Sequence, residues 1–187
     1  MSDRTKQLTA MAMLTAMAFI LGAVLRLRGI FPMAPFLTFE LKDVGILIGG
    51  FMFGPLAALL MSIVLALLEM ITISESGILG AIMNALGSAA FTCTAAFIYN
   101  KKRGMKGAIV GLVAGSLVMT TVMILFNYVI TPLYVPGVTR EAVTLMILPA
   151  LLPFNLIKAG VNSIVVLLIY KRVSVALKAA GFYKSLD

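Results

Sequence analysis

The stretch that decides the fold lies near the carboxyl end of the chain, where residues 148–170 read LPALLPFNLIKAGVNSIVVLLIY. It is apolar almost throughout, yet it carries Asn155, Lys158 and Asn162. Their i, i+3, i+7 spacing would place all three on one face of a helix. Because a Lys inside a membrane span costs roughly 2.5–3.5 kcal/mol on insertion scales, the stretch predicts an intramembrane polar site with Lys158 as its charged member.

The composition of the rest of the chain agrees with a membrane location. Of its 187 residues, 61% are hydrophobic and only 12% are charged, whereas about 25% are charged in a typical soluble domain. At ~20 residues per span, this length allows about six helices and no separate soluble domain. We therefore expect an all-α integral membrane protein in which residues 1–187 form a single transmembrane domain.

Features that the sequence lacks exclude several classes of function. It has no His and only one Cys, Cys93, so His-based catalysis, disulfide scaffolds and Cys-rich metal sites are not expected. It has no GxxxxGK[ST] phosphate-binding loop, so the chain is not expected to hydrolyse ATP itself. The net charge of +8 would suit a nucleic acid, but the basic residues lie where they would orient a membrane protein. We expect a binding subunit that needs partners, and neither an enzyme nor a nucleic-acid-binding protein.

The apolar segments predict six transmembrane helices, at about 8–27, 44–51, 55–73, 78–99, 107–130 and 148–170. The second is too short to span unaided unless it starts near Leu41. The connections are two long loops, a polar turn and a basic loop, at 26–41, 131–144, 75–77 and 100–106. With six spans, ten of the fifteen Lys and Arg residues share the side of both termini, and four lie on the other side. The positive-inside rule then puts both termini in the cytoplasm and the long loops outside.

This orientation places polar residues from several helices at a similar depth. Asn127 lies about one turn below the outer end of the fifth helix, and Asn155 and Lys158 lie roughly 7–15 Å below that of the sixth, at 1.5 Å per residue. Glu69 and Asn84 fall in the same half of the third and fourth helices. Few polar groups in an apolar setting, beneath two apolar loops, predict a pocket open to the outside. Asn donates and accepts while Lys only donates, so a neutral ligand with ring carbonyls and ring nitrogens would fit.

Other interpretations of the same residues stay open at this point. The Asn residues in the spans could hold helices together by hydrogen bonds, and Lys158 could pair with Glu69. We expect Glu69 to reach the membrane interface, with a place in a cavity wall as the alternative. The apolar loop 26–41 is either an interfacial anchor or a lid. We favour the lid, because charged residues follow it at once and would close over a polar ligand.

Small residues in the first helix predict close helix packing. Ala12 and Ala16 have a small-xxx-small spacing that lets another helix approach, and Ala18 and Gly22 repeat that spacing on a different face. Packing within the bundle and a surface for a partner protein both agree with this spacing.

Three stretches resemble a known family. They are Phe39-Glu40-Leu41-Lys42-Asp43-Val44 leading into Gly49-Gly50-Phe51-Met52-Phe53-Gly54-Pro55, then Asn127, then Asn155-Leu156-Ile157-Lys158. The chain, from residue 1 to about 175, is similar to the substrate-binding S component of an energy-coupling-factor (ECF) vitamin transporter, and most similar to the riboflavin-specific members. The F-G-P turn together with Asn-x-x-Lys is the more specific part of the resemblance.

The resemblance implies a function and partners. Such proteins bind riboflavin from outside and hand it inward by toppling in the membrane, while a transmembrane scaffold subunit and two cytoplasmic ATPases supply the energy. The chain would then be a multi-pass protein of the cell membrane, in contact with lipid. Riboflavin would be its transported ligand, and it would need no cofactor or metal.

The resemblance also implies roles for individual residues. Asn127, Asn155 and Lys158 match residues that hydrogen-bond the polar edge of the isoalloxazine ring. The loop 36–43 would cover the ribityl chain, and Asn84 and Gly87 would border it. The expected substrate-binding residues are Asn127, Asn155, Lys158, Phe39, Glu40, Leu41, Asp43, Asn84 and Gly87. Ala12 and Ala16 are similar to the family's motif for docking on the scaffold subunit.

Two alternatives remain. The nearer is an S component for another vitamin or flavin such as flavin mononucleotide (FMN), whose phosphate would need extra basic groups that Lys42 or Arg140 could supply. The sequence has no Trp and no His. This argues against the thiamine-specific relatives, whose pocket resembles an aromatic cage with a His and an acid. The more distant alternative is an integral-membrane enzyme, for which the chain offers only lone carboxylates.

Overall fold

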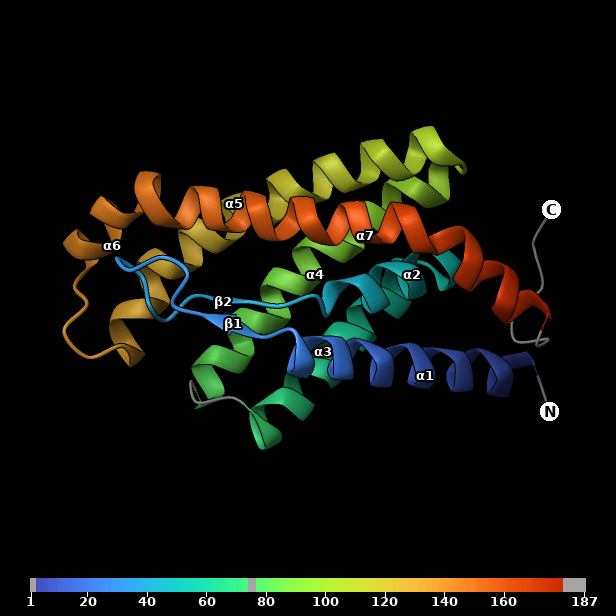
Figure 1. Ribbon diagram of the computed structural model, residues 1–187, viewed down its shortest axis with the longest axis horizontal. Helices are drawn as coiled ribbons and strands as arrows, with labels where there is room; N and C mark the ends of the chain where they lie inside the picture. The colour runs from blue at the N-terminus through green and yellow to red at the C-terminus, as the bar shows by residue number, and fades with distance from the viewer. Residues whose placement is uncertain (1–2, 74–76, 180–187) are drawn as a thin grey trace.

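A computed structural model describes residues 3–73 and 77–179 as a bundle of helices (Figure 1). Within these residues the helices are α1 (Asp3–Val24), α2 (Asp43–Phe53), α3 (Pro55–Thr72), α4 (Gly77–Lys101), α5 (Met105–Tyr134), α6 (Arg140–Met146), the π-helix η1 (Ile147–Leu151) and α7 (Leu152–Ala179). Two short strands, β1 (Leu27–Arg28) and β2 (Thr38–Phe39), pair antiparallel within the connection from α1 to α2. The all-α prediction is confirmed.

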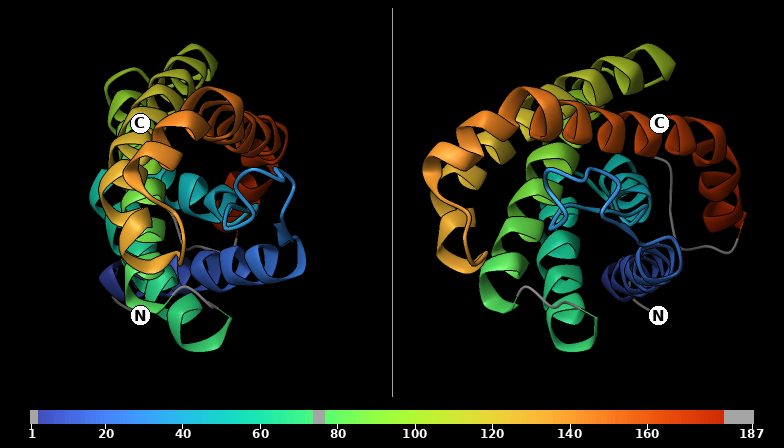
Figure 2. Two further views of the ribbon diagram at one scale, coloured as in Figure 1. Left: turned by 90° about the vertical axis from the view of Figure 1, so that its left-hand side faces the viewer. Right: turned by 60° about the vertical axis from the view of Figure 1, so that its left-hand side comes forward.

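Five helical segments of the described chain are long and apolar enough to cross a membrane, namely α1, α3, α4, α5 and the continuous run from α6 through α7. The remaining helix, α2, has 11 residues, which at 1.5 Å per residue is about 16 Å, or about half of a hydrocarbon core. Ten of these residues are buried. The second predicted helix is therefore a short element in the centre of the bundle, enclosed by the longer helices (Figure 2).

The predicted loop 131–144 is wrong, because most of it is helical. The helix α5 continues through Pro132 to Tyr134, and α6 already begins at Arg140. Thr139 caps α6 by accepting a hydrogen bond from the backbone N–H of Ala142 at 3.2 Å. A capping Thr followed by an acidic residue in the first turn is a usual helix start. The predicted turn at 75–77 falls mostly outside the described residues.

The chain alternates between two ends of the bundle. The start of α1, the α2–α3 and α4–α5 connections and the end of α7 lie at one end, and the loop 25–42 lies with α6 at the other (Figure 1). The loop 25–42 therefore lies at the end of the bundle where the central helix α2 begins.

Glycine and alanine let α1 lie directly on α2. A Cβ atom on Gly45 would stand 2.7 Å from the Cβ of Ala18 and 2.8 Å from the carbonyl oxygen of Leu14, too close for any side chain. Ala18 and Gly22 are buried on this inner face, whereas Ala12 and Ala16 are exposed. The first small pair therefore remains on the surface and the second packs within the bundle.

The tip of the loop 25–42 packs on protein. A small buried cluster joins it to α6, η1 and α7, and consists of Ala34, Leu37, Val143, Ala150, Leu151 and Phe154. The ring of Phe31 packs edge-on against that of Phe154, with 6.0 Å between their centroids. These contacts agree with the interpretation of the loop as a lid.

Candidate ligand-binding site

A cavity lies beneath this loop, between it and helices α4, α5 and α7. Its polar lining residues are Arg26, Thr38, Glu40, Asp43, Asn84, Ser88, Asn127, Tyr134, Asn155 and Lys158. Its other lining residues are Phe36, Leu37, Met83, Met119, Met123 and Phe154, together with Gly80 and Gly87. A few polar groups among flat or flexible apolar groups are typical of a site for an organic ring ligand.

Most of the residues expected from the sequence meet in this cavity. They are Glu40, Asp43, Asn84, Gly87, Asn127, Asn155 and Lys158. Phe39 and Leu41 do not line it, and pack instead against the cluster under the loop tip and against the main core. Successive residues of an extended chain point to opposite sides, so between Thr38 and Leu41 the side chains of Thr38 and Glu40 face the cavity while Phe39 and Leu41 face away.

Lys158 presents a charge to the cavity. It lies on α7, is 8% exposed and lines the cavity wall. Within the described part of the chain its ammonium makes no direct hydrogen bond or ion pair. The alternative that Lys158 pairs with Glu69 is wrong, because Glu69 is bonded to Lys42. Lys158 is thus placed to donate to a ligand.

Asn127 and Asn155 are held in fixed orientations by their own helices. The amide nitrogen of Asn127 donates to the carbonyl of Met123 at 2.7 Å, and that of Asn155 donates to the carbonyl of Leu151 at 2.7 Å. Each amide group has a second N–H that can bond elsewhere. The Leu151 carbonyl ends η1, and π-helical turns of this kind occur often at functional sites.

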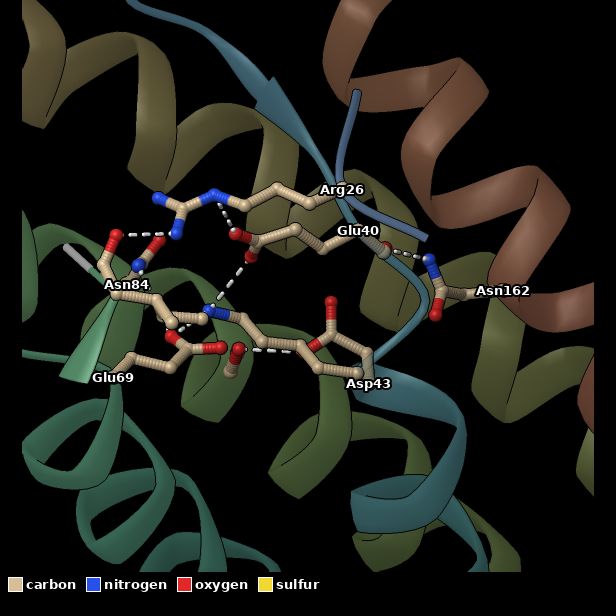
Figure 3. Close-up of polar contacts among 9 residues, drawn as sticks. Arg26, Glu40, Asp43, Glu69, Asn84 and Asn162 are labelled. Atoms are coloured by element: carbon tan, nitrogen blue, oxygen red, sulfur yellow. Dashed lines mark hydrogen bonds and ion pairs between the residues drawn. The ribbon is translucent and has the colours of Figure 1, made fainter. Parts of the chain in front are cut away.

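Asn162 shares the predicted face but has a different task. It is fully buried, and its amide nitrogen donates to the carbonyl of Lys158 at 2.8 Å and to that of Glu40 at 3.2 Å. The second bond joins α7 to the end of the loop 25–42 (Figure 3). The polar face of α7 therefore lines the cavity at Asn155 and Lys158 and anchors the loop at Asn162.

A buried ion network lies behind the cavity wall (Figure 3). The ammonium of Lys42 is 2.5 Å from Oε2 of Glu69 and 3.0 Å from Oε2 of Glu40. The other oxygen of Glu40 is 3.5 Å from Nε of Arg26, and Asn84 donates to Glu69 at 3.3 Å. The expectation that Glu69 reaches the membrane interface is wrong, since Glu69 is 2% exposed and bonded within the bundle.

The charges around the cavity balance. Burial alone would raise the pKa of Glu40, but the cations of Lys42, Lys158 and Arg26 outweigh it and lower the pKa, so the carboxylate stays ionised. Burial opposes the charge of Lys42 as well, yet Glu40, Glu69 and Asp43 raise its pKa. Three cations thus face three carboxylates in and behind the wall, which favours a neutral ligand.

Sequence reasoning left several lining residues unassigned, although the helical period could have found some of them. Met119 and Met123 precede Asn127 by eight and four positions, and Ser88 follows Asn84 by four, so each shares a face with a residue that was singled out. Ser88 donates to Oδ1 of Asp43 at 2.5 Å. Arg26 lies in the loop, where no helical periodicity links it to the other cavity residues.

A second hollow lies on the outer surface of the bundle between α1 and α3. Ala12 and Ala16 line this groove together with Leu8, Met11, Thr15, Leu60, Met61, Val64 and Leu68. The groove is almost wholly apolar, and the two alanines keep its floor open.

Known proteins resemble the chain over nearly its whole length. The family described as "ECF transporter, substrate-specific component" matches residues 6–170. The riboflavin transporter RibU of Staphylococcus aureus (strain TCH60) is 35% identical over 185 residues, which cover 94% of both chains. The riboflavin transporter FmnP of Bacillus subtilis (strain 168) is 31% identical over 176 residues, which cover 89% of this chain and 91% of FmnP.

A solved structure has the same fold. It is that of the S component of a bacterial ECF transporter, which is 36% identical and has a TM-score of 0.78. The match covers 94% of this chain and 99% of the solved one. With its several apolar helices the chain is a multi-pass membrane protein, and it belongs to the family of substrate-specific (S) components of ECF transporters.

Proposed function

We propose that this protein is the riboflavin-binding S component of an ECF-type importer, which captures riboflavin outside the cell and delivers it inward without catalysing a reaction. The observation that carries the proposal is the meeting of Lys158, Asn127 and Asn155 in one cavity of balanced charge. Both curated relatives above are named riboflavin transporters, which supports the same ligand.

The chemistry of riboflavin matches this cavity. The polar edge of its ring system carries two carbonyls, unprotonated nitrogens and one N–H, which suit an ammonium donor beside amides that both donate and accept. The flat apolar part of the ring suits the sulfur and methylene surface of Met83, Met119 and Met123. Its ribityl hydroxyls would bond the polar residues under the loop, such as Glu40 and Asn84.

The same cavity favours riboflavin over FMN, the nearest alternative. A phosphate would need free cations in addition to Lys158, but Lys42 is 1% exposed and bonded to two carboxylates. Arg140 does not line the cavity, and its guanidinium lies 5.9 Å from the ring centre of Tyr128. Arg26 does line it, but faces Glu40. Lys42 and Arg26 are therefore paired with carboxylates, and Arg140 lies outside the cavity.

We further propose that both termini lie in the cytoplasm and that the groove at Ala12 and Ala16 receives the transmembrane scaffold subunit, which two cytoplasmic ATPases would drive. Exposed basic residues gather at the end of the bundle that holds the start of α1 and the end of α7, namely Lys101, Lys102, Arg103, Lys106, Lys171 and Arg172. Such a cluster is typical of the cytoplasmic side. An exposed small-residue groove suits close approach of another helix.

The experiment that tests the ligand is purification in detergent, followed by visible absorption spectroscopy and mass spectrometry of the released ligand. We expect a flavin spectrum at about one riboflavin per chain, and quenching of riboflavin fluorescence when the ligand-free protein is titrated. Release of FMN in place of riboflavin would favour the alternative. A colourless protein that quenches neither flavin would contradict the proposal and point to another vitamin.

A further inference from the structure

Glu69 has no part in the cavity wall, yet it is among the most buried charges of the described chain. It lies on α3, is 2% exposed and holds the ammonium of Lys42 at 2.5 Å. Its other oxygen, Oε1, is buried without a hydrogen-bond partner among the described residues. A buried pair with an unmet acceptor is a poor source of stability, since apolar residues of similar size often serve as well or better. The pair therefore calls for a reason other than stability.

The position of the pair in the chain supplies that reason. Lys42 is the residue immediately before α2, at the end of the loop 25–42. It bonds Glu69 on α3 and, within the loop, Glu40. Glu40 in turn faces Arg26 at the start of the loop, and Arg26 donates to the carbonyl of Ile73 after α3 at 2.6 Å. Both ends of the loop are thus tied to the end of α3.

The next contacts connect the same groups to the cavity. Glu40 and Arg26 line it themselves, and Asn84, which also lines it, donates to Glu69. Figure 3 shows these side chains converging from the loop, α3 and α4. A shift of the Lys42–Glu69 pair would therefore move cavity residues on two separate segments.

Helix α1 closes over the pair. Gly22 lies so near that a Cβ atom there would be 3.2 Å from Cβ of Lys42 and 3.4 Å from Oε1 of Glu69. The absence of a side chain at Gly22 lets α1 shield both charges, which strengthens their attraction.

We infer that Lys42 and Glu69 are positioning residues that hold the loop 25–42 over the cavity and so slow the escape of the ligand. The inference rests on the proposed function for the identity of that ligand. Neither Lys42 nor Glu69 contacts the ligand. The pair acts by fixing the positions of Glu40, Arg26 and Asn84.

The test replaces both charges at once, by Lys42→Met with Glu69→Met, so that Glu69 is not left as an unpaired buried charge, while Glu40 loses Lys42 and keeps Arg26. We expect thermal stability close to that of the natural protein, because a buried pair can be exchanged for apolar groups at little cost. Riboflavin dissociation, followed by recovery of flavin fluorescence, should be about tenfold faster or more, because the loop would open more often once Lys42 no longer holds Glu40. A natural dissociation rate in a well-folded double variant would overturn the inference.

A matched control separates positioning from general loss of stability. Ser62 lies on the same helix, is 1% exposed and bonds the carbonyl of Ala58 at 2.8 Å, far from the loop contacts. Ser62→Ala should lower thermal stability and leave riboflavin dissociation unchanged. If Ser62→Ala accelerates dissociation as much as the double variant does, the effect is one of stability and the inference fails.

Hydrogen exchange gives a readout that needs no ligand. The backbone amides of Ala34 and Leu37 are hydrogen-bonded at 2.9 and 3.1 Å, and both residues are buried where the loop tip packs on α6, η1 and α7, so their exchange reports whether the loop stays closed. We expect faster exchange at both amides in the double variant and natural exchange in Ser62→Ala. If the natural protein fails to bind riboflavin, the proposed function falls, while these amides still decide the inference.

A second variant covers the case in which the double variant does not fold. Gly22→Ala keeps both charges but places a methyl group against them, whereas Gly160→Ala adds the same methyl on α7 with nothing within 4 Å. We expect Gly22→Ala to speed riboflavin dissociation several-fold and Gly160→Ala to leave it unchanged. Equal dissociation rates and equal loop exchange in the two alanine variants would count against the inference.

Discussion

Lys42 and Lys158 are both buried in the same apolar bundle, but the two lysines are compensated in opposite ways. Lys42 is 1% exposed, and its ammonium contacts the carboxylates of Glu40 and Glu69. Lys158 is 8% exposed and lines the cavity without a direct ion pair to any described residue. A buried charge is costly without partners, and Lys42 has two carboxylates in direct contact, whereas the ammonium of Lys158 has no direct partner among the described residues and can still donate a hydrogen bond.

The largest effect should come from breaking the internally paired lysine alone. Lys42→Met leaves Glu40 and Glu69 buried near one another without their shared cation, which costs about 3–5 kcal/mol when one partner of a buried pair is removed. We expect a clear fall in the thermal unfolding temperature in detergent. The exposed Lys106→Met is the control and should unfold like the natural protein. Unchanged stability of Lys42→Met would show that the pair is solvated.

Removing the other lysine should give the reverse pattern. Lys158→Met takes away no internal ion pair, so the thermal stability of the ligand-free protein should be equal to the natural value or higher. Riboflavin affinity should fall about 30- to 150-fold, because a hydrogen bond from a charged group contributes about 2–3 kcal/mol. Fluorescence titration measures this, with the exposed Lys171→Met on the same helix as control. Natural affinity in Lys158→Met would remove Lys158 from the site.

Local sequence singles out Lys158, whereas the ion pairs of Lys42 follow only from the fold. Lys158 stands within an apolar run long enough to span a membrane, where a charge is rare and costly, and Asn155 and Asn162 share its helical face. A local pattern of that kind needs no knowledge of the fold. Asn127 and the small pairs of α1 were recognisable for the same reason.

The partner of Lys42 depends on distant parts of the chain. Glu69 is 27 positions away on another helix, and local spacing cannot tell which of several cations it meets. The alternation that turns Phe39 and Leu41 away from the cavity rests on a strand pair of two residues, which is too short to leave a period in the sequence. Helix α6, in contrast, could have been predicted from the sequence, because Thr139 is a typical N-cap residue and an acidic residue follows it in the first turn.

The smallest effect should come from a change in the charge balance around Lys42 and Lys158. Glu40 faces Arg26 and Lys42 at once, so Glu40→Gln would leave an excess positive charge beside the cavity. A phosphate would gain from this and a neutral flavin would not. We therefore expect the ratio of FMN to riboflavin affinity to rise, by on the order of 1 kcal/mol or about fivefold.

The ratio of the two affinities is the proper measure, because any loosening of the loop by Glu40→Gln weakens both ligands alike. Glu141→Gln is the matched control, since it removes the same charge from the exposed start of α6, away from the cavity wall. An equal rise of the ratio in both variants would assign selectivity to the overall charge of the outer face. A rise of the ratio in Glu40→Gln alone would assign the selectivity to the carboxylate of Glu40, which pairs with Arg26 and Lys42. Lys158 would then be the cation that contacts the flavin ring.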